Sequence, residues 1–320
     1  MLQKNKNIFF FIFFISIVCN PTIAKTQEDS LWKDLGLYGG QIPAIAVDPE
    51  NSSTLYAGSW TGDGLFKSVD GGANWSSIPW FKNMDVSDIE IDPNDSSTLW
   101  VAYKQYIAVS HDAGNTWKSF HFASLEGRFC YTVAVDPFDL TGNTVYVGTG
   151  GPDGANEYGE IFTTIDGGET WDPWGFDTQT NTRNNFCDIT FNPGIPGEIW
   201  AANRKSYSSP DGRVYVSPDY GESWFYWGGA FDLQGTFQSF SYIDEVLINP
   251  VDPLKIFLSS QYGVARKNDG QGDAAWQWTS TFGDSCRAMC IPPSAPNIIY
   301  AGLPDTIAKS TDSGDTWDET

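Results

Sequence analysis

The chain has 320 residues and carries 18 Lys and Arg against 40 Asp and Glu, which gives a formal net charge of −22 at pH 7. This excess of negative charge argues against binding to nucleic acid or to anionic lipid surfaces, because both attract basic proteins. Five cysteines are too few for a scaffold that depends on disulfides, and 15% of the residues are aromatic.

The first 24 residues have the features of a secretory signal peptide. Two lysines precede a short apolar run, and Ala24 ends a suitable cleavage site. A lipoprotein signal at Cys19 is the alternative, but Val18 does not suit it, because such sites favour a small residue before the cysteine. The apolar run is too short for a comfortable membrane span. We therefore expect residues 25–320 to be exported, to the periplasm, the cell surface or the medium, without a membrane span.

Four short apolar segments then recur in the same order along the chain. The first ends in Asp-Pro or Asn-Pro, where proline stops a strand because it has no N–H to donate. A second segment follows, and the third and fourth flank a Gly-rich turn. β-Branched and aromatic residues dominate all four, as is typical of strands. The first segments of successive units end at Val47, Ile91, Val135, Phe191 and Ile248.

The turn between the third and fourth segments repeats the phrase Ser/Thr-x-Asp-x-Gly-x-x-Trp. Its copies start 42, 54, 53 and 93 residues apart, and a worn copy with Asp269 and Trp276 lies in the last, double interval. Six units of this length predict an all-β fold, a β-propeller with six recognisable blades of four antiparallel strands. A seventh blade is open if the chain is a fragment truncated at its C-terminus. The constant residues are Ser68, Asp70, Gly72, Trp75, Ser110, Asp112, Gly114, Trp117, Thr164, Asp166, Gly168, Trp171, Ser217, Asp219, Gly221, Trp224, Ser310, Asp312, Gly314 and Trp317.

We interpret the repeated phrase as structural and not as catalytic or metal-binding. Asp and Gly in this pattern are turn residues, the hydroxyl can satisfy a backbone group, and Trp offers a large apolar plate to the neighbouring blade. Function is usually confined to one site and is not repeated in every unit. The sequence also contains no complete calcium loop or zinc pattern, and we predict no metal and no cofactor. Cys130, Cys187, Cys286 and Cys290 are expected to be buried free thiols, although a bridge between the first two is conceivable.

In a propeller, the Asp-Pro turns and the repeated turns share one face, so the irregular loops lie on the other. Those loops are rich in aromatic residues and carboxylates, which suit sugar rings and their hydroxyls. The alternative is that several aromatics cap the ends of blades, above all Trp174 and Trp227, which follow the repeated tryptophans closely. The candidate ligand-binding residues are Trp60, Asp63, Trp80, Phe81, Tyr106, Phe122, Trp174 and Trp227. The loop acids are Asp63, Asp85, Glu126, Asp153, Glu157, Asp177, Asp232 and Asp244.

The repeated phrase is identified as the Asp-box, or BNR repeat. Together with the first unit, from Gly39 to Gly72, it makes the chain similar to bacterial sortilin/Vps10-like proteins, to photosystem-assembly-factor-like proteins and to family 74 xyloglucanases. The resemblance covers nearly all of residues 25–320 and implies the propeller fold of the sialidase-like superfamily. The resemblance does not decide the activity, because glycoside hydrolases, sorting receptors and assembly factors all share the box.

Each resemblance implies residues that can be sought in this chain. Sialidases place an Arg-Ile-Pro near the start, where this chain reads Gln41-Ile42-Pro43, so the first of their three arginines is missing. Xyloglucanases carry one catalytic aspartate in the loop that holds Asp63, and a second in another propeller. Asp63 is therefore a weak catalytic candidate and at most half of a site. A basic patch, as in the assembly factor, does not fit the negative charge, and the cysteine-rich module of sorting receptors is not found.

We expect an exported propeller that binds an extracellular polysaccharide or protein through its aromatic loop face without catalysis. One alternative is a glycoside hydrolase resembling family 74 xyloglucanases, with Asp63 as one carboxylate. Another is a scaffold or assembly factor for other proteins. Nucleic acid is not an expected partner.

Overall fold

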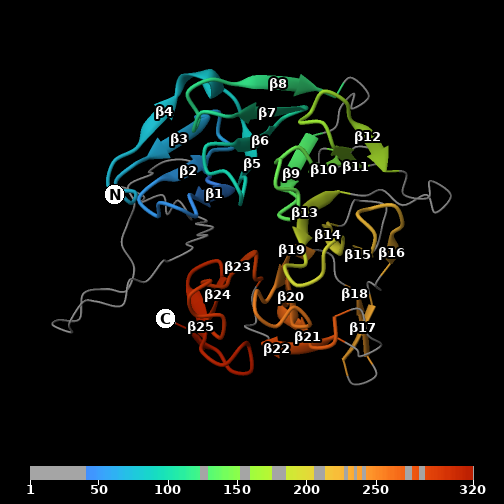
Figure 1. Ribbon diagram of the computed structural model, residues 1–320. Helices are drawn as coiled ribbons and strands as arrows, with labels where there is room; N and C mark the ends of the chain where they lie inside the picture. The colour runs from blue at the N-terminus through green and yellow to red at the C-terminus, as the bar shows by residue number, and fades with distance from the viewer. Residues whose placement is uncertain are drawn as a thin grey trace, which may run out of the picture.

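A ring of six four-stranded antiparallel sheets forms the part of the chain that the structure describes (Figure 1). In every sheet the strands are hydrogen-bonded in chain order, with the first strand of each blade nearest the centre of the ring. The predicted all-β propeller with six blades is confirmed. The computed structural model describes residues 41–122, 129–151, 159–174, 185–204, 213–226, 230–233, 236–239, 243–270, 276–280 and 285–319.

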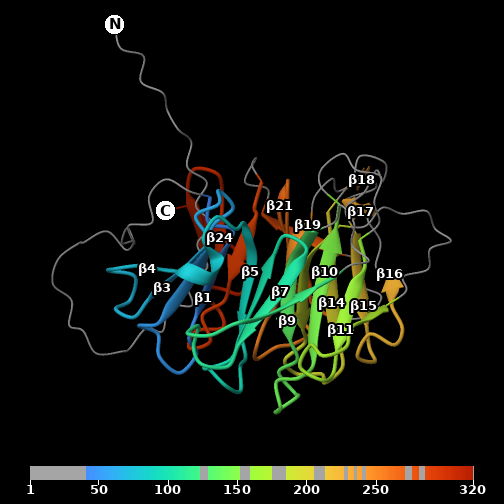
Figure 2. The ribbon, with the colours of Figure 1, turned by 90° about the horizontal axis from the view of Figure 1, so that it is seen from above.

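The blades follow one another along the chain, and an additional hairpin of β17 (Ala230–Leu233) and β18 (Thr236–Ser239) lies between the fourth and fifth. Figure 2 shows the ring from the side, with the strands running from one face to the other. The strands of the six blades are β1 Ala44–Val47, β2 Leu55–Gly58, β3 Leu65–Ser68 and β4 Ser76–Ile78; β5 Val86–Ile91, β6 Leu99–Tyr103, β7 Tyr106–Ser110 and β8 Lys118–His121; β9 Phe129–Val135, β10 Val145–Gly150, β11 Ile161–Thr164 and β12 Asp172–Trp174; β13 Phe186–Phe191, β14 Ile199–Asn203, β15 Arg213–Ser217 and β16 Phe225–Tyr226; β19 Ile243–Ile248, β20 Ile256–Ser260, β21 Gly263–Lys267 and β22 Gln277–Ser280; β23 Ala288–Cys290, β24 Ile299–Gly302, β25 Ile307–Ser310 and β26 Asp318–Glu319.

Residues 1–40, which include the expected signal peptide, lie outside the described residues. A 3₁₀ helix, η1 (Pro79–Phe81), follows the first blade. Across the described ranges, no helix is both long and apolar enough to cross a bilayer. The cysteines Cys130, Cys187, Cys286 and Cys290 form no disulfide in the structure.

The Asp-boxes and the turns between first and second strands lie on one face of the ring, the lower face. In every blade, the residue directly after the box aspartate donates its N–H to a carbonyl in the turn between the first and second strands of the same blade. In the first blade this bond joins Gly71 to Ser53 over 2.9 Å, and in the worn fifth copy it joins Gly270 to Leu254 over 2.9 Å. One backbone hydrogen bond per blade thus joins the two turns. It is also present in the fifth blade, where the box sequence is incomplete.

Within an intact box, the carboxylate of the aspartate accepts hydrogen bonds from residues of its own turn. In the second blade, Ser110 Oγ donates to Asp112 Oδ1 over 2.8 Å and accepts the N–H of Gly114 over 2.9 Å. The backbone and hydroxyl of Thr116 donate to the same carboxylate over 2.7 and 2.6 Å. These donors lower the pKa of Asp112 to about 2, led by the Thr116 hydroxyl. A carboxylate bonded in this way serves the turn and is not offered to a ligand.

The worn copy in the fifth blade replaces the hydroxyl residue with a lysine. Lys267 is fully buried, and its ammonium pairs with Asp269, the box aspartate of this blade. A buried charge is costly unless it is paired. The ammonium therefore takes the place of the missing hydroxyl as the partner of the aspartate.

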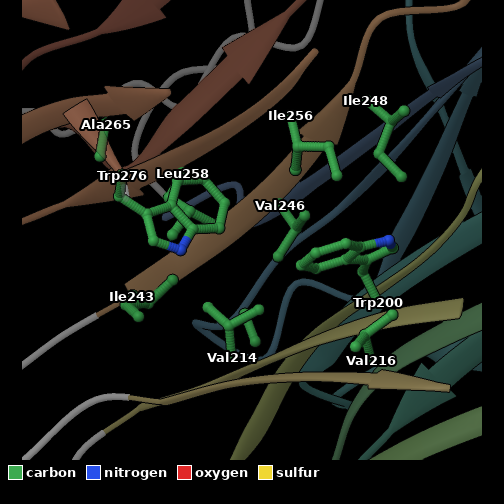
Figure 3. Close-up of a cluster of buried hydrophobic side chains, with 11 residues drawn as sticks. Trp200, Val214, Val216, Ile243, Val246, Ile248, Ile256, Leu258, Ala265 and Trp276 are labelled. Atoms are coloured by element: carbon green, nitrogen blue, oxygen red, sulfur yellow. The ribbon is translucent and has the colours of Figure 1, made fainter. Parts of the chain in front are cut away.

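Tryptophans fill the seams between neighbouring blades. Trp171 of the third box packs edge-on against Trp100 of the second blade, with ring centroids 6.2 Å apart. Figure 3 shows the seam between the fourth and fifth blades, where Trp200 and Trp276 meet with centroids 6.4 Å apart among aliphatic side chains. Large flat rings bury much apolar surface in such a seam. The core is therefore a series of seams around the ring, and the axis is left to other side chains.

Candidate functional site

A pocket of about 790 Å³ opens at the axis of the ring, on the face opposite the Asp-boxes, here called the upper face. Residues from all six blades line it, so it is a feature of the whole array of blades and not of a single loop. This axial pocket lies where the first strands begin and where second strands turn into third strands. Its lining residues are Gln41, Trp60, Asp85, Ser87, Lys104, Phe129, Tyr131, Asn185, Cys187, Arg204, Asp244, Gln261, Ser285 and Arg287.

β-Bulges in the first strands aim side chains into the axial pocket. The register between first and second strands skips one residue in four blades, and the skipped residues are Ser87, Tyr131, Cys187 and Asp244. All four line the pocket. A bulge bends the strand and re-aims a side chain that regular alternation would point elsewhere. The same irregularity, repeated around the ring, therefore builds the wall of the site.

Three carboxyl groups lie deeper, in a second cavity of about 350 Å³. This cavity shares much of its lining with the axial pocket. Asp88 accepts the N–H of Val133 over 2.9 Å, and Asp188 accepts that of Val246 over 2.7 Å. Glu245 likewise accepts the N–H of the next blade's first strand, at Met289, over 2.6 Å. The side chains of all three residues are partly exposed and line this second cavity. Each one clamps its own blade to the blade that follows.

Burial changes how these carboxyl groups titrate. It raises the pKa of Asp188 to about 7, with the charge of Asp88 adding to the effect. Burial also raises the pKa of Glu245 well above the usual value, with the charge of Asp188 adding to the effect. Loss of water around a carboxylate disfavours its charged form, and so does a like charge nearby. The lining of the second cavity therefore carries less negative charge at neutral pH than its number of carboxyl groups suggests.

The mouth of the axial pocket is charged. Arg204 follows β14 and pairs with Asp244 of the next blade, with Nε 2.5 Å from Oδ1. Lys104, in the turn between β6 and β7, and Arg287, just before β23, also line the mouth. Asp85 adds a second carboxylate. The site thus combines three cations with two acids in a chain that is strongly negative elsewhere.

Cys187 lines the pocket but does not suit a nucleophilic role. Burial raises the pKa of its thiol to about 12. Its Sγ donates to the carbonyl of Ile243 over 3.2 Å. A thiol needs a lowered pKa to react at neutral pH, so Cys187 acts as a structural part of the wall. Among the described residues, no group of three or more His, Cys, Asp or Glu is arranged to hold a metal ion.

Two residues that the sequence singled out lie in one loop of the upper face. Trp60, between β2 and β3, lines the axial pocket and is 39% exposed. Asp63 is exposed in the same loop, and Thr61 Oγ1 donates to its Oδ2 over 2.7 Å. Asp63 is not among the residues that line the pocket. Of the predicted loop acids, Asp85 and Asp244 do line it.

Trp80 belongs to a different surface. It is 46% exposed and lines a groove of about 420 Å³ at the rim, between the end of the first blade and the Asp-box of the second. Tyr106 stacks between Tyr103 and His121, with ring centroids 5.3 and 4.6 Å away. The structure therefore separates Trp60 from Trp80 and leaves Tyr106 in a stack of its own blade.

The remaining described aromatic candidates pack between blades, which for Trp174 agrees with the alternative that it caps the end of its blade. Phe81 is 0% exposed and packs edge-on against Trp117, with centroids 4.8 Å apart, because η1 folds it back into the seam of the first two blades. Phe122 is 6% exposed and lies in the seam of the second and third blades. Trp174 packs against the core of the third and fourth blades. These three are seam residues. Trp227 lies outside the described residues, as do the predicted loop acids Glu126, Asp153, Glu157 and Asp177.

The cations of the pocket, Lys104, Arg204 and Arg287, were not among the residues that the sequence proposed as a site. A signal for part of the wall was nevertheless present in the repeat. The residue five positions before the Asp-Pro, Asn-Pro or Pro-Pro turn of each unit lines one of the two axial cavities, and aligning the units brings these residues into one column. They are Pro43, Ser87, Tyr131, Cys187, Asp244 and Arg287.

Comparison with known proteins places the chain among propellers that include xyloglucanases. No protein-family model matches it. A xyloglucanase of Hypocrea jecorina is 25% identical over 243 residues, which cover 63% of this chain and 28% of that protein. Xyloglucanase Xgh74A of Acetivibrio thermocellus is 24% identical over 252 residues, with coverage of 63% and 28%. The chain thus spans less than a third of the length of these curated relatives.

Solved structures show the same fold. An ancestral GH74 enzyme superposes with a TM-score of 0.67 at 18% identity, over 87% of this chain and 40% of that one. YCF48 from Cyanidioschyzon merolae superposes with a TM-score of 0.62 at 15% identity, over 88% of this chain and 85% of that one. The chain is therefore an Asp-box β-propeller that is related in sequence to xyloglucanases and shares the fold of GH74 enzymes and of YCF48.

Proposed function

We propose that the protein binds a polysaccharide chain at the axial pocket. The observation that carries this proposal is the lining of the pocket, where an exposed indole and planar polar side chains from all six blades surround about 790 Å³. That volume is typical of pockets for small ligands. Trp60 supplies a flat apolar surface for a sugar ring, and the amides of Gln41, Asn185 and Gln261 can exchange hydrogen bonds with hydroxyl groups.

The sequence relatives support a carbohydrate over other ligands of the same size. The curated proteins to which the chain is similar are xyloglucanases. Aromatic stacking combined with amide and carboxylate partners is also what a polyhydroxylated ring requires. A β-glucan decorated with further sugars, such as xyloglucan, is accordingly the first ligand to test.

Hydrolysis is a second candidate function, and Asp63 favours it. Its carboxylate is exposed beside Trp60, and Thr61 and Ser59 donate to its Oδ2 over 2.7 and 3.4 Å. Glycoside hydrolysis normally needs two carboxyl groups, one as acid and one as base or nucleophile. Asp63 would supply one of them. The resemblance to xyloglucanases, which hold an aspartate in this loop, points to the same residue.

Titration of the protein with xyloglucan oligosaccharides, followed by calorimetry, tests the binding proposal. We expect Trp60→Ala to weaken binding by about five- to tenfold, since stacking against an indole contributes about 1–1.5 kcal/mol. Trp80→Ala is the matched control, because Trp80 is similarly exposed but lines the rim groove. Equal loss in both variants, or no binding to any member of a neutral and acidic glycan panel, would refute the proposal.

Release of reducing ends from the same polysaccharides tests hydrolysis separately. We expect Asp63→Asn to abolish release while leaving binding within about threefold, because the amide keeps the size of the side chain and its place in the loop. Binding without any release by the wild-type protein would reject the catalytic candidate and leave the binding proposal intact.

A further inference from the structure

Three cations converge on the mouth of the axial pocket from alternate blades. Lys104 comes from the second blade, Arg204 from the fourth and Arg287 from the sixth. They approach the axis from three directions, in a chain with 40 acidic against 18 basic residues. A neutral sugar is satisfied by hydroxyl, amide and aromatic partners. The three cations outnumber the two acids that line the same pocket, Asp85 and Asp244, so the pocket favours a ligand that carries negative charge.

Lys104 holds its place at the mouth in an unfavourable conformation. It lies in the two-residue turn between Tyr103 and Tyr106, with φ at 48°. Glycine and asparagine suit this left-handed conformation, whereas other residues are strained there by about 1 kcal/mol. No described carboxylate forms an ion pair with its ammonium. The tight hairpin requires this conformation, and the Lys104 carbonyl accepts the N–H of Cys130 of the third blade over 2.6 Å, so the backbone fixes the turn at the pocket.

Arg204 is oriented for a ligand by its neighbour. Asp244 engages Nε, so the guanidinium is fixed in direction and its two terminal nitrogens form the fork that suits a carboxylate. This leaves Asp85 as the other acid of the mouth. Below them, Asp88, Asp188 and Glu245 accept backbone N–H groups of the following blades, and burial raises their pKa. The deeper acids are thus directed to the seams and repel an anion at the mouth less than full charges would.

We propose that the axial pocket selects uronic-acid residues of an acidic polysaccharide, with Lys104, Arg204 and Arg287 contacting the sugar carboxylate and Trp60 the sugar ring. The inference rests on the proposed glycan-binding function and names its ligand class. A uronate unites the two features that the pocket addresses, a flat ring and a carboxylate. Neutral xyloglucan presents only the first, and the carboxylate of a peptide C-terminus only the second.

Tetragalacturonate and its carboxyl-reduced counterpart, in which each carboxylate is a primary alcohol, form a matched pair of probes. We expect the acidic probe to bind at least about tenfold more tightly, and its advantage to shrink as salt is added. Lys104→Asn removes the charge and places a residue that suits the turn, so it should fold normally while lowering affinity for the acidic probe by about tenfold. Arg287→Gln should act in the same direction. Lys82→Asn, at an exposed lysine outside the pocket, is the control and should change nothing.

The outcomes separate this inference from the function on which it rests. Equal affinity for the acidic and reduced probes, or an unchanged affinity in Lys104→Asn with a normal melting curve, overturns uronate selection but leaves glycan binding standing. Absence of binding to both probes and to neutral oligosaccharides overturns glycan binding itself. Binding of a peptide with a free C-terminal carboxylate in place of the uronide, lost in Lys104→Asn, would keep the carboxylate site and reject the sugar.

Discussion

Arg204 Nε lies 2.5 Å from Asp244 Oδ1, so one ion pair joins the fourth and fifth blades at the mouth of the axial pocket. Asp244 reaches this position because it is the bulged residue of β19, and its side chain is only 7% exposed. Arg204 is 32% exposed and stays partly in contact with water. The pair therefore closes a seam of the ring and orients a cation of the site at the same time.

Loss of one partner should destabilise the ring. We expect Asp244→Ala to lower the free energy of unfolding by about 1–3 kcal/mol, because it leaves a partly buried guanidinium without its counter-ion. Lys118→Ala is the control, since it breaks the Lys118–Glu169 pair, whose side chains are 54% and 68% exposed. That change should cost less than about 0.5 kcal/mol. Urea unfolding measures both, and equal losses would contradict the assigned burial of the Arg204–Asp244 pair.

Stability should depend on pH in two separate windows. Because the folded protein raises the pKa of Asp188 to about 7 by burial, it binds this proton more tightly than the unfolded chain does. The free energy of unfolding therefore falls as pH rises from about 4 to about 7, by up to about 1.4 kcal/mol per unit. Asp188→Asn should flatten this limb and be more stable than wild type at pH 7. Denaturant titrations across the window measure it, and an unchanged slope would disprove the assignment to Asp188.

The Asp-boxes give the opposite slope at lower pH. Hydrogen bonds led by the Thr116 hydroxyl lower the pKa of Asp112 to about 2, and those led by Thr170 and Thr316 do the same for Asp166 and Asp312. The stability that these carboxylates contribute is present above about pH 4 and is lost as pH falls toward 2. Acid unfolding should therefore persist in Asp188→Asn, and its disappearance would contradict the role of the boxes.

Phe81 and Trp80 are neighbours in sequence but should respond differently to truncation. Phe81→Ala empties a fully buried position in the seam of the first two blades and should cost about 3–5 kcal/mol. Trp80→Ala, at a side chain that is 46% exposed, should change stability by about 1 kcal/mol or less. Thermal or urea unfolding distinguishes them. Similar costs in the two variants would contradict the burial that the structure assigns.

The worn box offers a test of its lysine. Lys267→Met keeps the apolar stem of the buried side chain but removes the ammonium that pairs with Asp269. We expect a loss of about 1–2 kcal/mol in unfolding free energy, because a carboxylate that is 34% exposed loses its counter-ion. Lys255→Met, which breaks a partly exposed pair with Asp252, should be nearly neutral. A stabilised Lys267→Met would show that the ion pair is dispensable.

The repeat by itself is enough to predict the propeller architecture. Box spacing, strand-ending prolines and turn residues are local signals, and the propeller follows because each unit needs a neighbour on which to bury its Trp. The same reasoning assigned the irregular loops to the face that holds the axial pocket, and Trp60, one of its candidate ligand-binding residues, lines that pocket. It failed for Phe81 and Phe122, because no local pattern tells a loop aromatic that folds back into a seam from one that faces water.

The sequence by itself determined the number of blades, the face of the boxes and the excess of acid. The tertiary structure decided which side chains meet at the axis. Lys104, Arg204 and Arg287 are far apart along the chain, and the arrangement of the blades around one axis places them in the same pocket as bulged residues such as Asp244. The physical reason is that a bulge and the packing of blades around an axis depend on contacts between separate segments, whereas turn chemistry and hydrophobic periodicity are written into a few consecutive residues.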